Sequence, residues 1–169
     1  MKGFTLIETM IAVTILSLSI AGPLFTASRA IVAAQISRDQ LTASYLAQEG
    51  IEYVRTLRDN EYLALYPPGT LTSTIAWTNF NASSIASCAS PNICTLGPAQ
   101  GNGTLPVAVC PGSVCTASFS LSTPGTPFKR TLQKVNVSST EEKIISSVSW
   151  SFHGVTYTVS VADHLTPWQ

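Results

Sequence analysis

The chain has 169 residues, enough for one domain and an anchoring segment but too few for two large domains. Charged residues make up 11% of it, against roughly 25% in an ordinary soluble domain. The formal net charge is zero, so charge offers no basis for binding nucleic acid or an acidic substrate.

An uncharged run of 20 residues extends from Thr9 to Ser28. This is about the length that a helix needs to cross the hydrocarbon core of a membrane. A secretory signal peptide has a shorter apolar run of about 7–15 residues, and the core helix of a globular domain is rarely uncharged for so long. The run therefore predicts a membrane-spanning helix.

Glu8 lies at the entrance of this run. An ionised carboxylate inside a membrane helix costs about 2.5–3.5 kcal/mol on insertion scales, and such a residue usually has a function and a partner. A plain membrane anchor leaves Glu8 unexplained. We therefore expect a cationic partner for its carboxylate.

The stretch KGFTLIE, from Lys2 to Glu8, resembles the class III signal of type IV pilins and pseudopilins. In that family a prepilin peptidase cuts after the glycine and methylates the new N-terminal phenylalanine. The resemblance implies a leader of residues 1–3, which is short for the family, with cleavage after Gly3 and N-methylation of Phe4. It also implies that Glu8 serves assembly by pairing with the Phe4 amine of a neighbouring subunit, which offsets the desolvation of both charges.

Gly22 and Pro23 interrupt the apolar run. Proline removes one helical hydrogen bond and its ring clashes with the carbonyl four residues earlier, so we expect a kink or local unwinding here. Neighbouring helices in a membrane can satisfy the freed backbone groups.

Beyond Arg29 the pattern remains helical but becomes amphipathic. Apolar or small residues recur at steps of three and four, which predicts one buried stripe: Ala43, Ala47, Gly50, Val54 and Leu57. The spacings Glu52–Arg55 and Arg55–Asp59 allow weak surface ion pairs. A helix from Phe4 to about Asn60 would be roughly 85 Å long at 1.5 Å per residue. Pro67 and Pro68 exclude its continuation.

The segment from Leu46 to Asp59 resembles the part that follows the anchor in minor pilins of the PilV kind and in pseudopilins close to them. This second resemblance favours a minor subunit of the filament over a major one.

The C-terminal part predicts an antiparallel sheet of about four strands, packed on the amphipathic half of the helix. Alternating apolar residues and turn signals give five candidate strands: Leu105–Val109, Ala117–Leu121, Phe128–Val137, Ile144–Phe152 and Val155–Ala162. His153 and Gly154 form a two-residue hairpin turn between the last two. Residues 70–104 are expected to be a polar, serine-rich connection. The fold class is α+β, the plan that the pilin resemblance also implies.

Four cysteines, Cys88, Cys94, Cys110 and Cys115, lie in this loop-rich region. An even number of cysteines in an exported chain favours disulfides, and four of them allow three connectivities. Short local bridges, 88–94 with 110–115, and crossed bridges are both open. Zinc is disfavoured because the spacers within each pair are not those of structural zinc sites and no histidine lies nearby.

No constellation of catalytic residues is evident. His153 and His164 are the only histidines, and neither belongs to a nucleophile–base arrangement. Glu141, Glu142 and Asp163 lack the alternating oxygen ligands of a calcium loop. We expect no enzymatic activity, no cofactor and no metal.

Taken together, the sequence predicts four segments: the leader 1–3, a transmembrane and assembly helix 4–28, an amphipathic helical half 29–60 and an extracytoplasmic β-rich domain 61–169. The resemblance implies a filament subunit that starts in the inner membrane and ends in a surface or periplasmic filament. Its implied partners are other pilin subunits, prepilin peptidase, the inner-membrane assembly platform and the lipid bilayer. A type II secretion pseudopilin and a membrane-anchored exported binding domain remain as alternatives.

Overall fold

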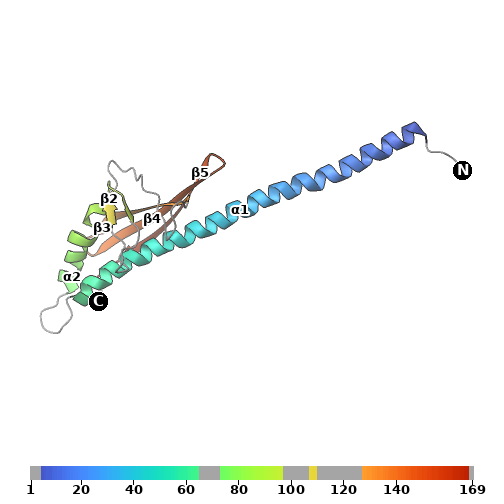
Figure 1. Cartoon of the computed structure of the whole chain (residues 1–169). Coiled ribbons are helices and arrows are strands. Elements are labelled where there is room, and N and C mark those ends of the chain that lie inside the picture. The colour runs from blue at the N-terminus through green and yellow to red at the C-terminus, as the bar shows by residue number, and fades with distance from the viewer. Residues whose placement is uncertain (1–4, 65–72, 97–106, 110–126, 168–169) are drawn as a thin grey trace, which may run out of the picture. The chain divides into compact units, whose positions relative to one another are not determined.

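The computed structural model describes residues 5–64, 73–96, 107–109 and 127–167 (Figure 1). The chain forms two compact units, Met1–Asp39 and Gln40–Gln169. The long helix α1 (Leu6–Ala64) supplies nearly all of the described part of the first unit and continues into the second. The predicted helix is thus confirmed, and it ends four residues beyond the expected Asn60.

The second unit contains a five-stranded antiparallel sheet in the order β2-β1-β3-β4-β5. Its strands are β1 (Cys94–Leu96), β2 (Val107–Val109), β3 (Lys129–Ser138), β4 (Glu141–Phe152) and β5 (Val155–Leu165). The sheet packs on the second half of α1, which confirms the α+β arrangement (Figure 1).

Three of the predicted strands match β3, β4 and β5, with ends that differ by at most three residues. The expected strand Leu105–Val109 overlaps β2, whereas Ala117–Leu121 lies outside the described residues. Strand β1 was not predicted, because its three residues show no alternation that a pattern could detect.

The hairpin between β4 and β5 turns at His153 and Gly154, as predicted. Both residues have positive φ angles, 50° and 80°, which is the backbone signature of a type I′ turn. Such turns match the right-handed twist of the two strands that they join. The register between β4 and β5 is accordingly unbroken from Phe152–Val155 to Glu142–Leu165.

The core of the second unit lies between α1 and one face of the sheet. The predicted helical stripe is buried at Ala43, Ala47, Gly50 and Val54, while Leu57 is partly buried. Every second residue of β4 points to this core, beginning with Glu142 and ending with Trp150.

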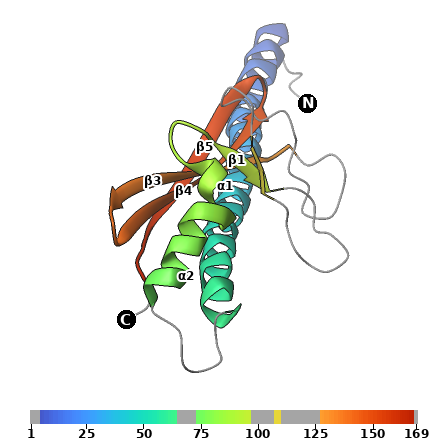
Figure 2. The same cartoon turned by 90° about the vertical axis from the view of Figure 1, so that its left-hand side faces the viewer.

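The expected polar, serine-rich connection over residues 70–104 contains helical turns and buried apolar side chains in its described part. This part contains α2 (Ser73–Asn79), a π-helical turn η1 (Phe80–Ser84) and a 3₁₀ turn η2 (Ala86–Cys88). Trp77, Phe80 and Ile85 bury their side chains in the core. Helix α2 lies beside the end of α1 (Figure 2), where the Tyr62 hydroxyl donates to the Ser73 carbonyl at 3.3 Å. The three side chains that this segment buries join the same cluster as Ile51 and Val54 of α1, so the segment forms part of the core.

Candidate functional site

The candidate site is the N-terminal half of α1. Its first turn begins at Thr5, whose carbonyl accepts hydrogen bonds from the amides of Glu8 and Thr9 at 3.1 and 3.2 Å. Gly3 and Phe4, the predicted cleavage and methylation positions, lie outside the described residues. The described helix begins at Leu6, two residues after Phe4.

The Glu8 side chain is exposed on this first turn. Within residues 5–64, 73–96, 107–109 and 127–167, no hydrogen bond or ion pair reaches its carboxylate. A carboxylate at the helix N-terminus is favoured by the helix dipole, but only by about 0.3–1 kcal/mol at an exposed position. The described residues thus leave room for an intermolecular partner of Glu8.

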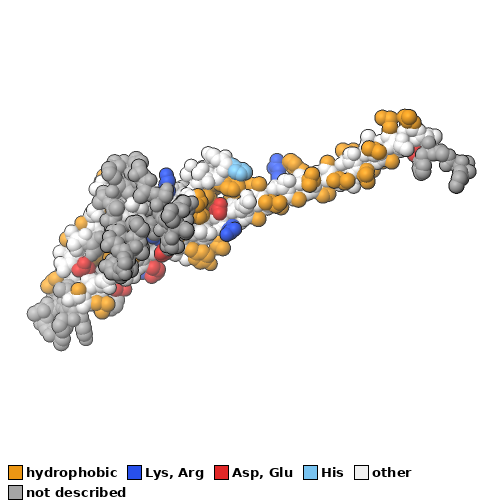
Figure 3. Space-filling model, viewed as in Figure 1, with side chains coloured by type: hydrophobic (Ala, Val, Ile, Leu, Met, Phe, Trp, Pro, Cys, Tyr) orange, Lys and Arg blue, Asp and Glu red, His pale blue; other side chains and the backbone are white. Residues whose placement is uncertain are grey.

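Apolar side chains cover this half of the helix without contacting a core. Leu6, Ile11, Leu18 and Phe25 are 78, 54, 76 and 60% exposed. Figure 3 shows hydrophobic side chains along the helix as far as its N-terminal end. By length and composition α1 is apolar enough to cross a membrane. None of the residues in its most hydrophobic 18-residue stretch is buried. This surface requires either lipid or other protein to cover it.

Five hydroxyl groups in the apolar half are satisfied by the helix itself. Each donates to a main-chain carbonyl three or four residues earlier, over 2.8–3.0 Å: Thr9, Thr14, Ser17, Thr26 and Ser28. An unsatisfied polar group in hydrocarbon costs several kcal/mol (about 2–7 for a hydroxyl or amide). The local bonds lower this cost, so these five residues are compatible with a membrane span.

Helical structure continues through Gly22 and Pro23 in the described chain. Pro23 has no amide hydrogen, so it cannot donate to the Ser19 carbonyl. One turn later the Thr26 hydroxyl lies within hydrogen-bonding distance of the carbonyls of Gly22 and Pro23, at 3.3 and 2.9 Å. A kink at Gly22 and Pro23 stays a prediction.

Arg55, on the second half of α1, connects the helix to β5. Its Nε and Nη2 donate to the Asp163 carboxylate at 3.1 and 2.9 Å, and Nη1 donates to Glu52 at 2.5 Å. The hydrogen bond with Asp163 is the main cause of the raised pKa of Arg55. The predicted Glu52–Arg55 pair is confirmed. The predicted Arg55–Asp59 pair is wrong, because Asp59 contacts the neighbouring Arg58 at 2.9 Å.

Arg130, on β3, is a buried cation that sequence reasoning missed. Its side chain is fully buried, and Nη1 donates to the Leu46 carbonyl at 2.9 Å and to Glu49 at 2.8 Å. Burial lowers the pKa of Arg130, and the charge of Glu49 opposes this shift. The sequence held one signal for it. Arg130 and Leu132 are two residues apart in the predicted strand, so both side chains lie on its core face.

Cys88 and Cys94 form a disulfide, with Cα atoms 5.2 Å apart. The local pairing is therefore present for the first two cysteines. It links the end of η2 to the start of β1. Cys110 and Cys115, the other two candidates, lie outside the described residues.

The two histidines belong to the second unit and lie apart from each other. His164 Nδ1 lies 2.6 Å from the Glu141 carboxylate on the exposed surface, and His153 occupies the hairpin turn. Among the residues that the structure describes, no group of three or more histidine, cysteine or carboxylate side chains could hold a metal ion.

Comparison with known proteins identifies one segment. Residues 1–22 match the family model described as "Prokaryotic N-terminal methylation motif". Neither a curated protein nor a solved structure matches the chain. This motif, at the start of a long apolar helix, supports a pilin- or pseudopilin-like exported subunit.

Proposed function

We propose that this protein is a minor pilin, a structural subunit of a type IV pilus or related filament. The observation that carries the proposal is that the methylation motif at residues 1–22 coincides with a half-helix whose apolar side chains have no core to cover them. Lipid around a membrane anchor and neighbouring helices in an assembled filament both provide such cover.

Processing supplies the charge that Glu8 needs. Cleavage after Gly3 by prepilin peptidase frees the amine of Phe4, and N-methylation leaves that amine able to carry a positive charge. In a staggered array of helices, Glu8 of one subunit pairs with Phe4 of the next. The pair is buried among apolar side chains, where the attraction of unlike charges is stronger than in water.

The four segments then take successive roles. Residues 1–3 are removed, residues 4–28 cross the inner membrane, and residues 29–60 carry the exported domain 61–169 on their amphipathic face. The Cys88–Cys94 disulfide fits a domain that folds outside the cytoplasm, where disulfides persist. The chain has no catalytic role in this scheme.

The proposed partners follow from the same roles. Prepilin peptidase acts on Gly3 and Phe4, the bilayer surrounds the helix first, and the inner-membrane assembly platform transfers it to other pilin subunits. A kink at Gly22 and Pro23 would adapt the helix to both surroundings.

Mass spectrometry of the N-terminal peptide, from cells with and without prepilin peptidase, tests the proposal. We expect a peptide that begins at methylated Phe4 only in cells that contain the peptidase. A peptide that keeps Lys2 in both strains would refute processing and leave an anchored exported domain. If processing is found, sheared surface filaments that contain the protein support a pilus subunit, whereas retention in the periplasm favours a secretion pseudopilin.

A further inference from the structure

Arg29 is the first charged residue after the uncharged run of α1, and its guanidinium is held against an aromatic ring. The guanidinium carbon lies 4.6 Å from the centre of the Phe25 ring, one turn earlier. Phe25 itself is 60% exposed. The cation is therefore oriented along the helix beside an apolar surface instead of extending freely into solvent.

Unlike other arginines of the chain, Arg29 has no carboxylate within ion-pair distance among the described residues. Arg55, Arg58 and Arg130 each contact an aspartate or glutamate at 2.9 Å or less. A guanidinium presents a planar fork of donors that suits carboxylate and phosphate groups. Arg29 has this fork available for an anion from outside the chain.

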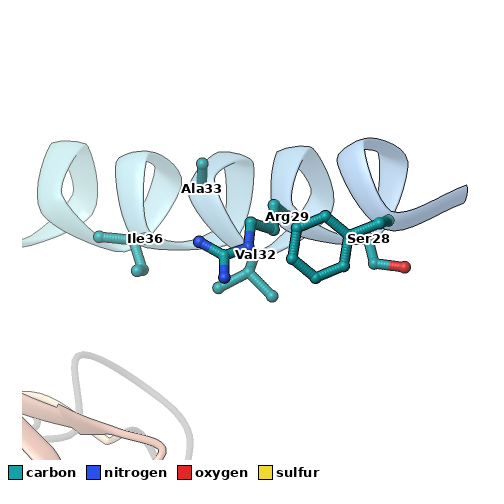
Figure 4. A pocket seen from close by; sticks show the side chains of 6 residues that line it. Ser28, Arg29, Val32, Ala33 and Ile36 are labelled. Carbon is teal, nitrogen blue, oxygen red and sulfur yellow. The ribbon is translucent and has the colours of Figure 1, made fainter. Parts of the chain in front are cut away.

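The surroundings of Arg29 are apolar. It contributes to a shallow depression of about 450 Å³ on α1, whose described lining is Phe25, Ser28, Arg29, Val32, Ala33 and Ile36. Arg29, Val32 and Ile36 project from one side of the helix (Figure 4). Arg29 is the one charged group in this described lining. The other polar side chain there, Ser28, donates its hydroxyl to the Leu24 carbonyl.

The distance between Glu8 and Arg29 matches the thickness of a bilayer. Arg29 follows Glu8 by 21 residues, and 21 helical rises of 1.5 Å give about 32 Å. The hydrocarbon core of a bilayer is about 30 Å thick. When Glu8 lies at one boundary of the hydrocarbon, Arg29 lies at the other, where lipid phosphates are the most abundant anions.

We propose that Arg29 binds the phosphate of a membrane phospholipid, with the Phe25 ring packed at the boundary of the hydrocarbon beneath it. Aromatic and basic side chains occupy such boundaries because one part of each is apolar and another is polar. The contact holds the helix at one depth before assembly. This inference rests on the membrane-anchoring step of the proposed function.

Native mass spectrometry of the full chain in detergent micelles tests this contact. Phosphatidylglycerol is the probe, and diacylglycerol with the same acyl chains is the phosphate-free comparison. The variants are Arg29→Gln, Arg29→Lys and, as a matched control nine residues further along the same helix, Arg38→Gln. We expect Arg29→Gln to lower the affinity for phosphatidylglycerol about fivefold, the effect of one basic residue near a lipid surface. Arg38→Gln should stay within about twofold of the wild type. Arg29→Lys, which keeps the charge but loses the planar fork, should bind with an affinity between those of the wild type and Arg29→Gln.

Several results would overturn the inference. These are equal affinity for diacylglycerol, displacement of the lipid by millimolar inorganic phosphate, or unchanged lipid binding in Arg29→Gln. If Arg29→Gln binds lipid normally but is lost from sheared filaments, the partner is another subunit. Carbonate extraction of membranes separates the two proposals: a wild-type chain absent from membranes refutes the anchor as well, whereas a membrane-bound chain with Arg29-independent lipid binding refutes this inference alone.

Discussion

Gly50 of α1 and Ser146 of β4 approach so closely that a Cβ atom on Gly50 would lie 2.5 Å from the Ser146 hydroxyl oxygen. The same Cβ would be 3.2 Å from side-chain atoms of Arg130 and Leu132. Gly50 and Ser146 are both buried. Glycine at this position therefore sets how closely the helix packs on the sheet.

Gly50→Ala should destabilise the domain. Alanine favours a helix over glycine by about 1 kcal/mol, but overpacking a buried site costs about 1–3 kcal/mol. Three crowded neighbours put the expected net loss at about 1–2 kcal/mol. Thermal unfolding of the full chain in detergent, followed by near-UV circular dichroism of the buried tryptophans, measures it.

Gly22→Ala is the matched control, because no atom outside its own turn of the helix backbone lies within 4 Å of the added Cβ. It should leave the unfolding of the domain unchanged. Adding Ser146→Ala to Gly50→Ala should recover part of the loss, since it removes the nearest contact. A Gly50→Ala protein as stable as the wild type would mean that helix and sheet can separate without cost.

Glu49→Gln should weaken the domain by removing the charge that faces the buried Arg130. Glutamine keeps an acceptor oxygen for Nη1 but removes the negative charge that Glu49 supplies to a fully buried guanidinium. Glu49 is 39% exposed, so solvent reduces the effect, and we expect a loss of about 1–2 kcal/mol in the free energy of unfolding.

Glu52→Gln provides the comparison for Glu49, since it neutralises the same residue type on the same helix. Glu52 is 64% exposed and its partner Arg55 also contacts Asp163, so its loss should be below about 0.5 kcal/mol. Equal effects of the two substitutions would contradict a special role for the buried cation. Both are measured by chemical unfolding of the full chain.

Removing the Cys88–Cys94 disulfide should loosen the segment from η2 to β1. A bridge across a sequence separation of six stabilises by about 2 kcal/mol in the loop-entropy estimate. The double variant Cys88→Ser, Cys94→Ser should therefore unfold at a lower temperature, and hydrogen exchange should increase at Cys94–Leu96. Digestion without reduction should yield the 88–94 linked peptide, and a peptide that links Cys88 to Cys115 would exclude this pairing.

Glu8→Ala should enter the membrane at least as readily as the wild type but join filaments poorly. The substitution removes an exposed carboxylate at the edge of the membrane helix, where its insertion cost is below the roughly 2.5–3.5 kcal/mol of a charge at the helix centre. It also removes the proposed partner of the Phe4 amine. Membrane fractions and sheared filaments are compared by immunoblot. Glu52→Gln, which neutralises a carboxylate outside the anchor, should assemble normally. Wild-type incorporation of Glu8→Ala would rule out the pairing.

Short-range patterns predicted the long helix, its apolar first half and the His153–Gly154 hairpin correctly. Each depends on consecutive residues: the length of the uncharged run from Thr9 to Ser28, and the alternation along β4 and β5. Hydrophobic period and turn chemistry act over a few residues, so they can be read without knowing the fold.

Contacts between distant residues depended on the three-dimensional arrangement. Glu49 and Arg130 are 81 residues apart, and Arg55 and Asp163 are 108 apart. The helical pattern suggested Asp59 as a partner for Arg55, but the fold presents Asp163 on β5 instead. The pairing of Cys88 with Cys94 was likewise one of several possibilities that the spacing left open. A charge on the helix pairs with whichever group the packed elements bring within reach, and that group is chosen by helix–sheet packing, not by its place in the chain.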